Sequence, residues 1–197
     1  INWGLTRQVA PQPRDVLPVS QRRITDGIPC DVAVPTDPED RAVVATILGE
    51  ASSPNKVGTR EYRDGDNFGS PSGDPITQDT LFAEAVLIAA TIRNRATRDS
   101  ATLEDTASAP NQFLGYDPGV ALLTSGSFGN IGDPNCEKLR NAVAALNALK
   151  SGNANNSFVT DFRAVVQDPD GRGGRPPFIR RQGAATRVGG TDFWPTQ

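Results

Sequence analysis

The sequence predicts a mainly helical α+β domain with long loops and an extended N-terminal arm. Three segments, near residues 37–52, 79–98 and 134–151, repeat apolar residues at the 3.6-residue period of an α-helix. The 19 glycines and 16 prolines favour loops and turns between and after these segments. Since 197 residues fit one domain, or one domain with an arm, we divide the chain into an arm over 1–35 and a domain over 36–197.

The arm holds five prolines and shows no apolar period. A segment of this kind is extended and gains order by lying on another surface. That surface is either the domain that follows or a neighbouring subunit, and the sequence leaves both open. The chain begins with Ile1 and not with a signal peptide pattern, so we expect a processed mature form or a piece of a longer chain.

The first helix is expected over about 37–52. It starts either from a capping box of Thr36 and Glu39 or from Asp37 as N-cap with Pro38 in the first turn. It ends at 49–51, where Gly-Glu-Ala is followed by Ser-Ser-Pro. Its apolar face is formed by Ala42, Val43, Ile47 and Leu48.

The second helix, about 79–98, follows a polar loop over 53–78 that is long enough to be functional or disordered. A broad apolar stripe predicts that this helix lies at the centre of the core. The stripe consists of Leu81, Ala85, Ile88, Ala89 and Ile92. Glu84 is assigned to a position off this stripe, so we expect it to be solvated or paired with an arginine.

Residues 102–132 are expected to be irregular, apart from a short helix at 102–107. The third long helix, about 134–151, has Asp133 as N-cap, Pro134 at its first position and Gly152 beyond its end. Its buried face comprises Leu139, Val143, Leu146 and Leu149. After it we expect short strands near 158–166 and 177–181, and then loop.

The composition excludes several kinds of chemistry. There is no histidine, which rules out Ser-His-Asp triads, Cys-His dyads and histidine-based zinc sites, so acid–base work must use Asp, Glu, Lys, Tyr or Cys. We expect no cofactor and no metal. No apolar run approaches the length of a membrane span.

The net charge of -3 gives no general attraction to nucleic acid or anionic membranes. Residues 163–187 nevertheless form a local basic patch with six arginines and two aspartates. Such a patch suits an anionic cell-wall polymer, nucleic acid or an acidic protein surface. Because no aromatic residues are interleaved in a nucleic-acid-binding pattern, we do not expect nucleic acid as a partner.

The two cysteines, Cys30 and Cys136, are too few for a structural zinc site. They are either buried free thiols or a disulfide. A disulfide would close a long loop, contribute about 4 kcal/mol in the chain-entropy model, and imply an oxidising compartment.

Glu50 is the first catalytic candidate because it ends an amphipathic helix beside a long polar loop. The negative end of the helix dipole, with partial burial, should raise its pKa, as a general acid requires. The alternative is a solvated glutamate near a helix end.

Six short motifs follow one another along residues 38–194. The first is 44–51, which contains Gly-Glu-Ala. The others are 85–95 ending in Asn94-Arg95, Gln112-Phe113, 144–152, 162–165 and 188–194.

In this order the motifs resemble the SleB/CwlJ-type cell-wall hydrolases. The resemblance implies a fold similar to lysozyme and the lytic transglycosylases, a glycosidase acting on peptidoglycan glycan strands, and Glu50 as the catalytic residue. It also implies a mechanism in which one glutamate acts first as acid and then as base. The sequence departs from the family at Thr191, where the family has histidine, and at an insertion over 62–66.

Further site residues are expected near Glu50. Gln112, Phe113 and Tyr116 follow the second helix and are candidates for substrate contact, through an amide that reads N-acetyl groups and through aromatic rings that cover sugar faces. For Phe113 the alternative is a place in the core. Ordinary hydrolysis stays open if a loop acid supplies a second carboxylate. The candidates are Glu61, Asp64, Asp66 and Asp74.

Two functions are compatible with these features of the sequence. The first is a secreted, periplasmic or virion-associated enzyme that cleaves peptidoglycan. The second is a non-catalytic particle, tail or fibre component that keeps a lysozyme-like scaffold and contacts neighbouring subunits through the 1–35 arm. The two differ in what surrounds Glu50.

Overall fold

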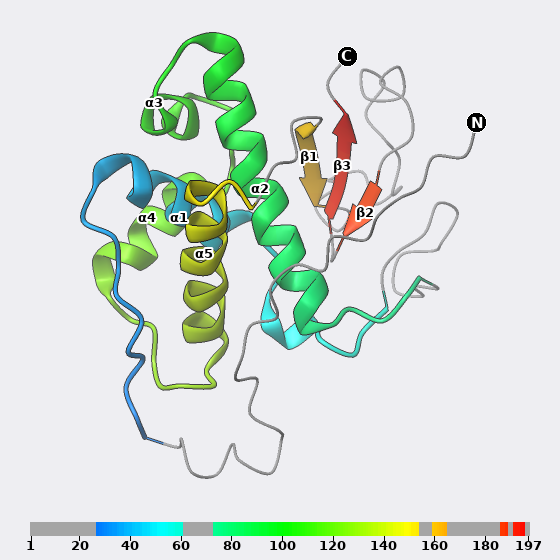
Figure 1. Ribbon diagram of the computed structural model, residues 1–197. Helices are drawn as coiled ribbons and strands as arrows, with labels where there is room; N and C mark the ends of the chain where they lie inside the picture. Colours follow the sequence, from blue (N-terminus) through cyan, green and yellow to red (C-terminus); the bar gives the residue numbers. More distant parts are fainter. Residues whose placement is uncertain (1–26, 61–72, 154–158, 165–185, 189–190, 196–197) are drawn as a thin grey trace.

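The computed structural model describes residues 27–60, 73–153, 159–164, 186–188 and 191–195. In these residues the protein is mainly helical, as predicted (Figure 1). The elements in chain order are α1 (Pro38–Glu50), the short 3-10 helix η2 (Pro54–Lys56), α2 (Gln78–Asp99), α3 (Leu103–Ser108), α4 (Tyr116–Ser125), α5 (Pro134–Lys150), β1 (Val159–Ala164), β2 (Thr186–Val188) and β3 (Thr191–Pro195). None of the described helices has the length and apolar character needed to cross a membrane.

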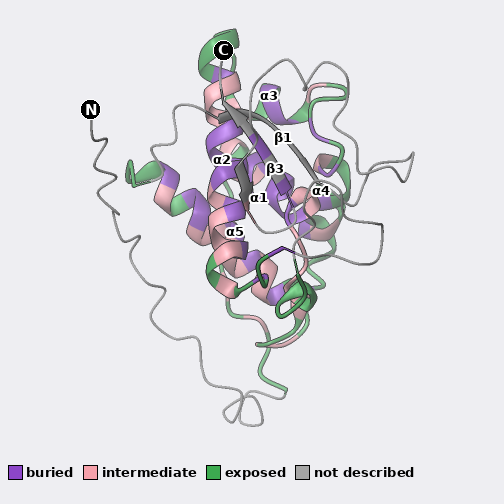
Figure 2. Ribbon diagram, turned by 90° about the vertical axis from the view of Figure 1, so that its right-hand side faces the viewer, coloured by how far each residue is buried: buried purple, intermediate pink, exposed green. Residues whose placement is uncertain are grey.

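Helix α2 lies between the small sheet and the other helices (Figure 1). Helix α1 lies inside the bundle and is buried from Ala42 to Leu48 (Figure 2). The core is formed where α1 and α2 pack with α5, and the side chains of Ile47, Ile88 and Leu139 are fully enclosed there. The C-terminal end of α1, with Glu50, therefore comes out of the most buried part of the fold.

Helix starts follow the expected residues in most cases. Asp37 is the N-cap of α1 and accepts a hydrogen bond from the Asp40 amide at 3.0 Å, so this start is used and the capping box is not. Glu39 instead accepts from the Leu103 amide at 3.3 Å and so joins α1 to α3. Asp133 precedes α5, but its carboxylate accepts from the Asn130 amide at 2.7 Å.

Helix α4 lies in the stretch that was expected to be irregular, and that expectation is wrong for residues 116–125. Pro118 and Gly119 lie in its first turn, and both residue types have low helix propensity, which argued against a helix here. Proline is tolerated there because the first amides of a helix have no partner within it. Gly119 is required by packing, since a Cβ on it would lie 1.8 Å from the carbonyl oxygen of Ala45 in α1.

Replacing Gly119 with Ala should lower the free energy of unfolding by about 3 kcal/mol, because the added methyl forces α4 away from the backbone of α1. Urea unfolding followed by circular dichroism measures this change. Gly126→Ala is the matched control at the other end of α4. There a Cβ meets nothing within 4 Å and only the positive φ of 63° opposes it, so we expect a loss of about 1 kcal/mol. Equal losses at the two positions would contradict the close α1–α4 packing.

The sheet has the order β1-β3-β2, with both pairs antiparallel. Strand β1 lies in the segment predicted at 158–166, whereas β2 and β3 occupy a stretch expected to be loop; the strand expected at 177–181 lies outside the described residues. Thr191, at the start of β3, pairs with Ala164 and with Val188. Thr191 and Phe193 are two positions apart, so they share a face, and both are buried.

The described end of the arm lies on the domain itself. The Cys30 amide donates to the Gly129 carbonyl at 3.0 Å, and the Ile131 amide donates to the Ile28 carbonyl at 2.8 Å. Cys30 and Cys136 form a disulfide with a Cα–Cα distance of 5.6 Å, which decides between the bridge and the free thiols. The arm is thereby attached covalently to the first turn of α5; residues 1–26 lie outside the described part of the chain.

Candidate active site

Glu50 is the last residue of α1, and its carboxylate reaches the start of α4. Its Oε1 accepts a hydrogen bond from the Gly115 amide at 2.6 Å. This contact depends on Gly49 and Gly115. A Cβ on Gly49 would lie 1.7 Å from the carbonyl oxygen of Gly115, and a Cβ on Gly115 would lie 2.4 Å from the carbonyl carbon of Gly49. The two backbones therefore approach more closely than any residue with a side chain would allow, and this brings the carboxylate to the positive end of α4.

The Glu50 side chain is half-buried, and this burial raises the pKa of its carboxyl above the ordinary value of 4.5. The Gly115 amide, the ammonium of Lys138, the guanidinium of Arg95 and the Leu114 amide all favour the ionised form and offset part of that rise. Burial is the largest of these effects, so the group keeps its proton to a higher pH than a solvated glutamate. It also keeps contact with solvent, as proton transfer to a bound molecule requires.

Glu84 is the second acidic residue at this place, and the expectation that it is solvated or paired with arginine is wrong. The residue is 0% exposed. Its Oε2 accepts from the Ser52 amide at 3.1 Å, and its Oε1 accepts from the Ser52 hydroxyl at 3.0 Å and from the Thr191 hydroxyl. Glu84 therefore joins α2 to the chain just after Glu50 and to β3. The sequence spacing indicated this burial, since Leu81 lies three residues before Glu84 and Ile88 four residues after it, which places all three on one helix face.

Burial raises the pKa of Glu84 from 4.5 to about 7, although hydrogen bonds from Thr191 and Ser52 and the charge of Lys138 favour the ionised form. A pKa that is higher in the folded than in the unfolded protein makes the folded state bind the proton more tightly. This contribution to stability is fully present below pH 4.5 and is lost as the pH rises to about 7. The loss amounts to about 3 kcal/mol.

Replacing Glu84 with Gln should therefore stabilise the protein at pH 8 by about 3 kcal/mol and remove the decline in stability between pH 4.5 and 7. Glutamine has the same shape and an oxygen that accepts from Ser52, but it carries no charge. The measurement is urea unfolding from pH 4 to 9 for both proteins. Parallel pH curves for the two proteins would contradict the burial of an ionisable group at this position.

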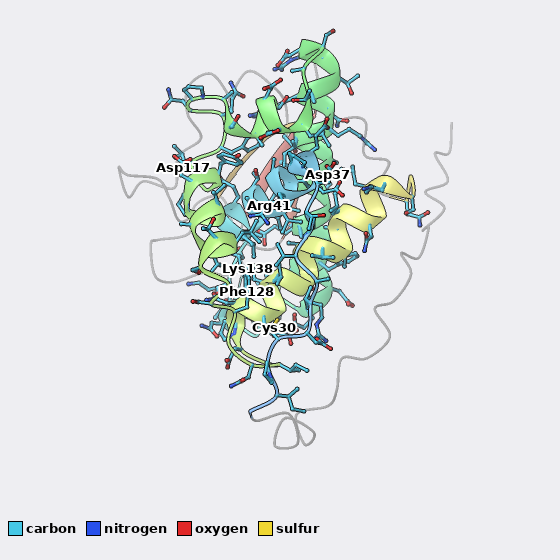
Figure 3. The ribbon with its side chains drawn as sticks, turned by 90° about the vertical axis from the view of Figure 1, so that its left-hand side faces the viewer. Cys30, Asp37, Arg41, Asp117, Phe128 and Lys138 are labelled. Atoms are coloured by element: carbon cyan, nitrogen blue, oxygen red, sulfur yellow. A yellow bond between two sulfur atoms is a disulfide. The ribbon has the colours of Figure 1, made fainter. Side chains whose placement is uncertain are left out.

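The positive charge of Lys138 acts on both acids. This lysine comes from α5 and, in the view of Figure 3, lies between the ribbons of α4 and α5. Burial lowers its pKa, while the charges of Glu84 and Glu50 act in the opposite direction. The same ammonium stabilises the ionised forms of Glu50 and Glu84. The site thus combines two carboxyl groups from α1 and α2 with one shared ammonium from α5.

The other expected site residues occupy the segment that leads to α4. Gln112 is exposed, and its Oε1 accepts from the Arg95 guanidinium at 2.9 Å. Phe113 is only 6% exposed and belongs to the core, with the Arg95 guanidinium 4.9 Å from its ring centre. We therefore assign Phe113 the core role that was its alternative and give it no substrate contact. Tyr116 is partly buried at the first position of α4.

Of the four loop acids named as candidates for a second carboxylate, Asp74 lies in the described part of the chain. Asp74 is exposed on the segment before α2. Glu61, Asp64 and Asp66 lie outside the described residues. Among the residues that the structure describes, Glu84 is the carboxyl that shares Lys138 with Glu50.

Comparisons of the chain with protein-family models, with curated proteins and with solved structures found no match. The resemblance carried by the sequence motifs therefore stays a prediction.

Proposed function

We propose that the protein is a lysozyme-like enzyme that cleaves the glycan strands of peptidoglycan as a lytic transglycosylase, with Glu50 as its acid and base. The observation that carries the proposal is the half-buried carboxyl of Glu50 at the end of α1, with a raised pKa and its Oε1 held by the Gly115 amide. A general acid must be protonated at the working pH and must hold a fixed position. The raised pKa favours the protonated form of Glu50, and the Gly115 amide holds its Oε1 in place.

The reaction needs only this one carboxyl. Protonated Glu50 gives its proton to the glycosidic oxygen, the bond from that oxygen to C1 breaks, and the sugar on the C1 side becomes an oxocarbenium ion. The carboxylate of Glu50 then takes the proton of the 6-hydroxyl of the same sugar, and O6 bonds to C1. The products are a strand end with a free 4-hydroxyl and a 1,6-anhydro ring, and Glu50 is again protonated.

The burial of Glu84 supports this one-carboxyl mechanism over hydrolysis by two carboxylates. In hydrolysis a second carboxylate activates water or attacks C1, and it must reach the substrate. Glu84 is enclosed and its oxygens are bound by Ser52 and Thr191, so it does not meet that requirement. The Cys30–Cys136 disulfide favours an extracytoplasmic or virion-associated protein, since disulfides persist in oxidising surroundings.

The test is digestion of purified peptidoglycan by the full chain, with the products identified by mass spectrometry. We expect muropeptides that end in 1,6-anhydromuramic acid, whose mass is lower by one water than that of a hydrolysed end. Reducing ends of ordinary mass would replace the transglycosylase with a hydrolase. Intact peptidoglycan after incubation with folded protein would overturn the enzyme proposal and favour the scaffold function.

A further inference from the structure

We propose that Glu84 is a positioning residue, which fixes the chain that follows Glu50 by binding both polar groups of Ser52 while Thr191 anchors it to β3. This inference rests on the proposed function, because it concerns how Glu50 is held for the same reaction. Glu84 does not touch the substrate. It acts through the backbone that carries the acid.

The contacts around Ser52 show how the position of Glu50 is determined. Only Ala51 separates Ser52 from Glu50. The Ala51 amide makes the last hydrogen bond of α1, to the Ile47 carbonyl at 2.9 Å. Beyond that bond the chain leaves the helix in an extended conformation. Glu84 binds the Ser52 amide and hydroxyl at 3.1 and 3.0 Å, so the first residue after this turn has both polar groups bound by one side chain.

Glu50 is thus held from two sides. On its own side chain, Oε1 is bound by the Gly115 amide at the start of α4. On its backbone, the chain is bound by Glu84 on α2 two residues later. Because Thr191 donates to the same Glu84 oxygen that Ser52 binds, the position of the acid is set jointly by α2, α4 and β3.

The charge of Glu84 is poorly explained by a purely structural role. Burial penalises an ionised carboxyl, and a neutral side chain of the same shape would make the fold more stable at neutral pH. The charged groups that bear on Glu84 are Lys138 from α5 and, through that shared ammonium, Glu50 from α1. A destabilising charge beside a reacting group is the arrangement expected where stability is given up for function.

The test compares three variants of the full chain on soluble glycan-strand oligomers, with kcat and KM measured at the pH where the parent is most active and thermal unfolding measured at pH 8. Glutamine has one acceptor oxygen and a donating NH2 in place of the second, so it cannot accept from both polar groups of Ser52 as Glu84 does. We expect Glu84→Gln to unfold at a higher temperature than the parent and yet to lose about 10-fold in kcat, with KM changed less than about twofold. Glu84→Leu removes the acceptor for Ser52 and should lose about 100-fold in kcat, the effect of a misplaced catalytic group. Thr91→Val is the control, because Thr91 is a buried residue of α2 whose hydroxyl binds the Leu87 carbonyl in its own helix.

A variant that is more stable and slower at once is not explained by damage to the fold. Glu84→Gln with the kcat of the parent would overturn the positioning role, and this variant keeps the proposal falsifiable if Glu84→Leu fails to fold. A loss in Thr91→Val equal to that in Glu84→Gln would also overturn it. An inactive parent would instead overturn the proposed function, which distinguishes the two failures.

Discussion

Replacing Glu50 with Gln is expected to lower the turnover of peptidoglycan by about 1,000-fold, within the range that removing a general acid produces. Glutamine has no proton to give to the glycosidic oxygen and cannot take one from the 6-hydroxyl. Its amide oxygen still accepts from Gly115, so the close approach of α1 and α4 is kept. Release of soluble muropeptides measures the loss, and circular dichroism shows that the variant is folded.

Glu104→Gln is the matched control, because Glu104 is an exposed glutamate in the first turn of α3. We expect it to retain the rate of the parent. The pH dependence gives a second check, since Glu50 must be protonated to act as an acid and burial raises its pKa above 4.5. The parent should therefore stay active above pH 4.5 and lose activity as the pH rises through the raised pKa. Full activity of Glu50→Gln would exclude Glu50 as the acid.

Removing the disulfide is expected to have the largest effect on stability. Replacing Cys30 and Cys136 with Ala should lower the free energy of unfolding by about 4 kcal/mol, within the range for removal of a native disulfide, because the bridge closes a loop across a separation of 106 residues. Residues 28–35 would then be held on the domain by hydrogen bonds, by the ion pair between Asp31 and Arg140, and by the packing of Val32 and Val34. Urea unfolding of the oxidised parent and of the double variant measures the difference.

Reductant supplies the control for this change. It should destabilise the parent by about the same amount and leave the double variant unaffected, because the variant has no cysteine. A difference below about 1 kcal/mol between parent and variant would contradict a bridge that restricts the unfolded chain. A parent that reacts with thiol reagents while folded would contradict the bridge itself.

The sequence determines the elements whose signals are local. Asp37 with Pro38 begins α1, Pro134 begins α5, and Gly152 follows its end with a φ of 76°. Each signal acts within one turn of helix, through an amide that is capped or through a backbone angle that favours glycine. The same reasoning places Glu50 at the end of an amphipathic helix, whereas the burial of every residue from Ala42 to Leu48 results from tertiary packing. The candidate acid was therefore found from the sequence, although its catalytic role stays a proposal.

Tertiary structure alone decides the features that depend on distant partners. Gly119 is unfavourable in a helix by local preference, yet α4 includes it, and glycine is required there because the backbone of Ala45 in α1 leaves no space for a side chain. Glu84 has the polarity of a surface residue, yet it is enclosed because Ser52 and Thr191, 32 residues before it and 107 after it, supply the hydrogen bonds that make its burial tolerable. Local propensity amounts to less than about 1 kcal/mol per residue, and close packing or a buried hydrogen bond exceeds it. The absence of histidine leaves a carboxyl such as that of Glu50 as the candidate acid, and only the folded chain brings Glu84 to Ser52, two residues after that acid.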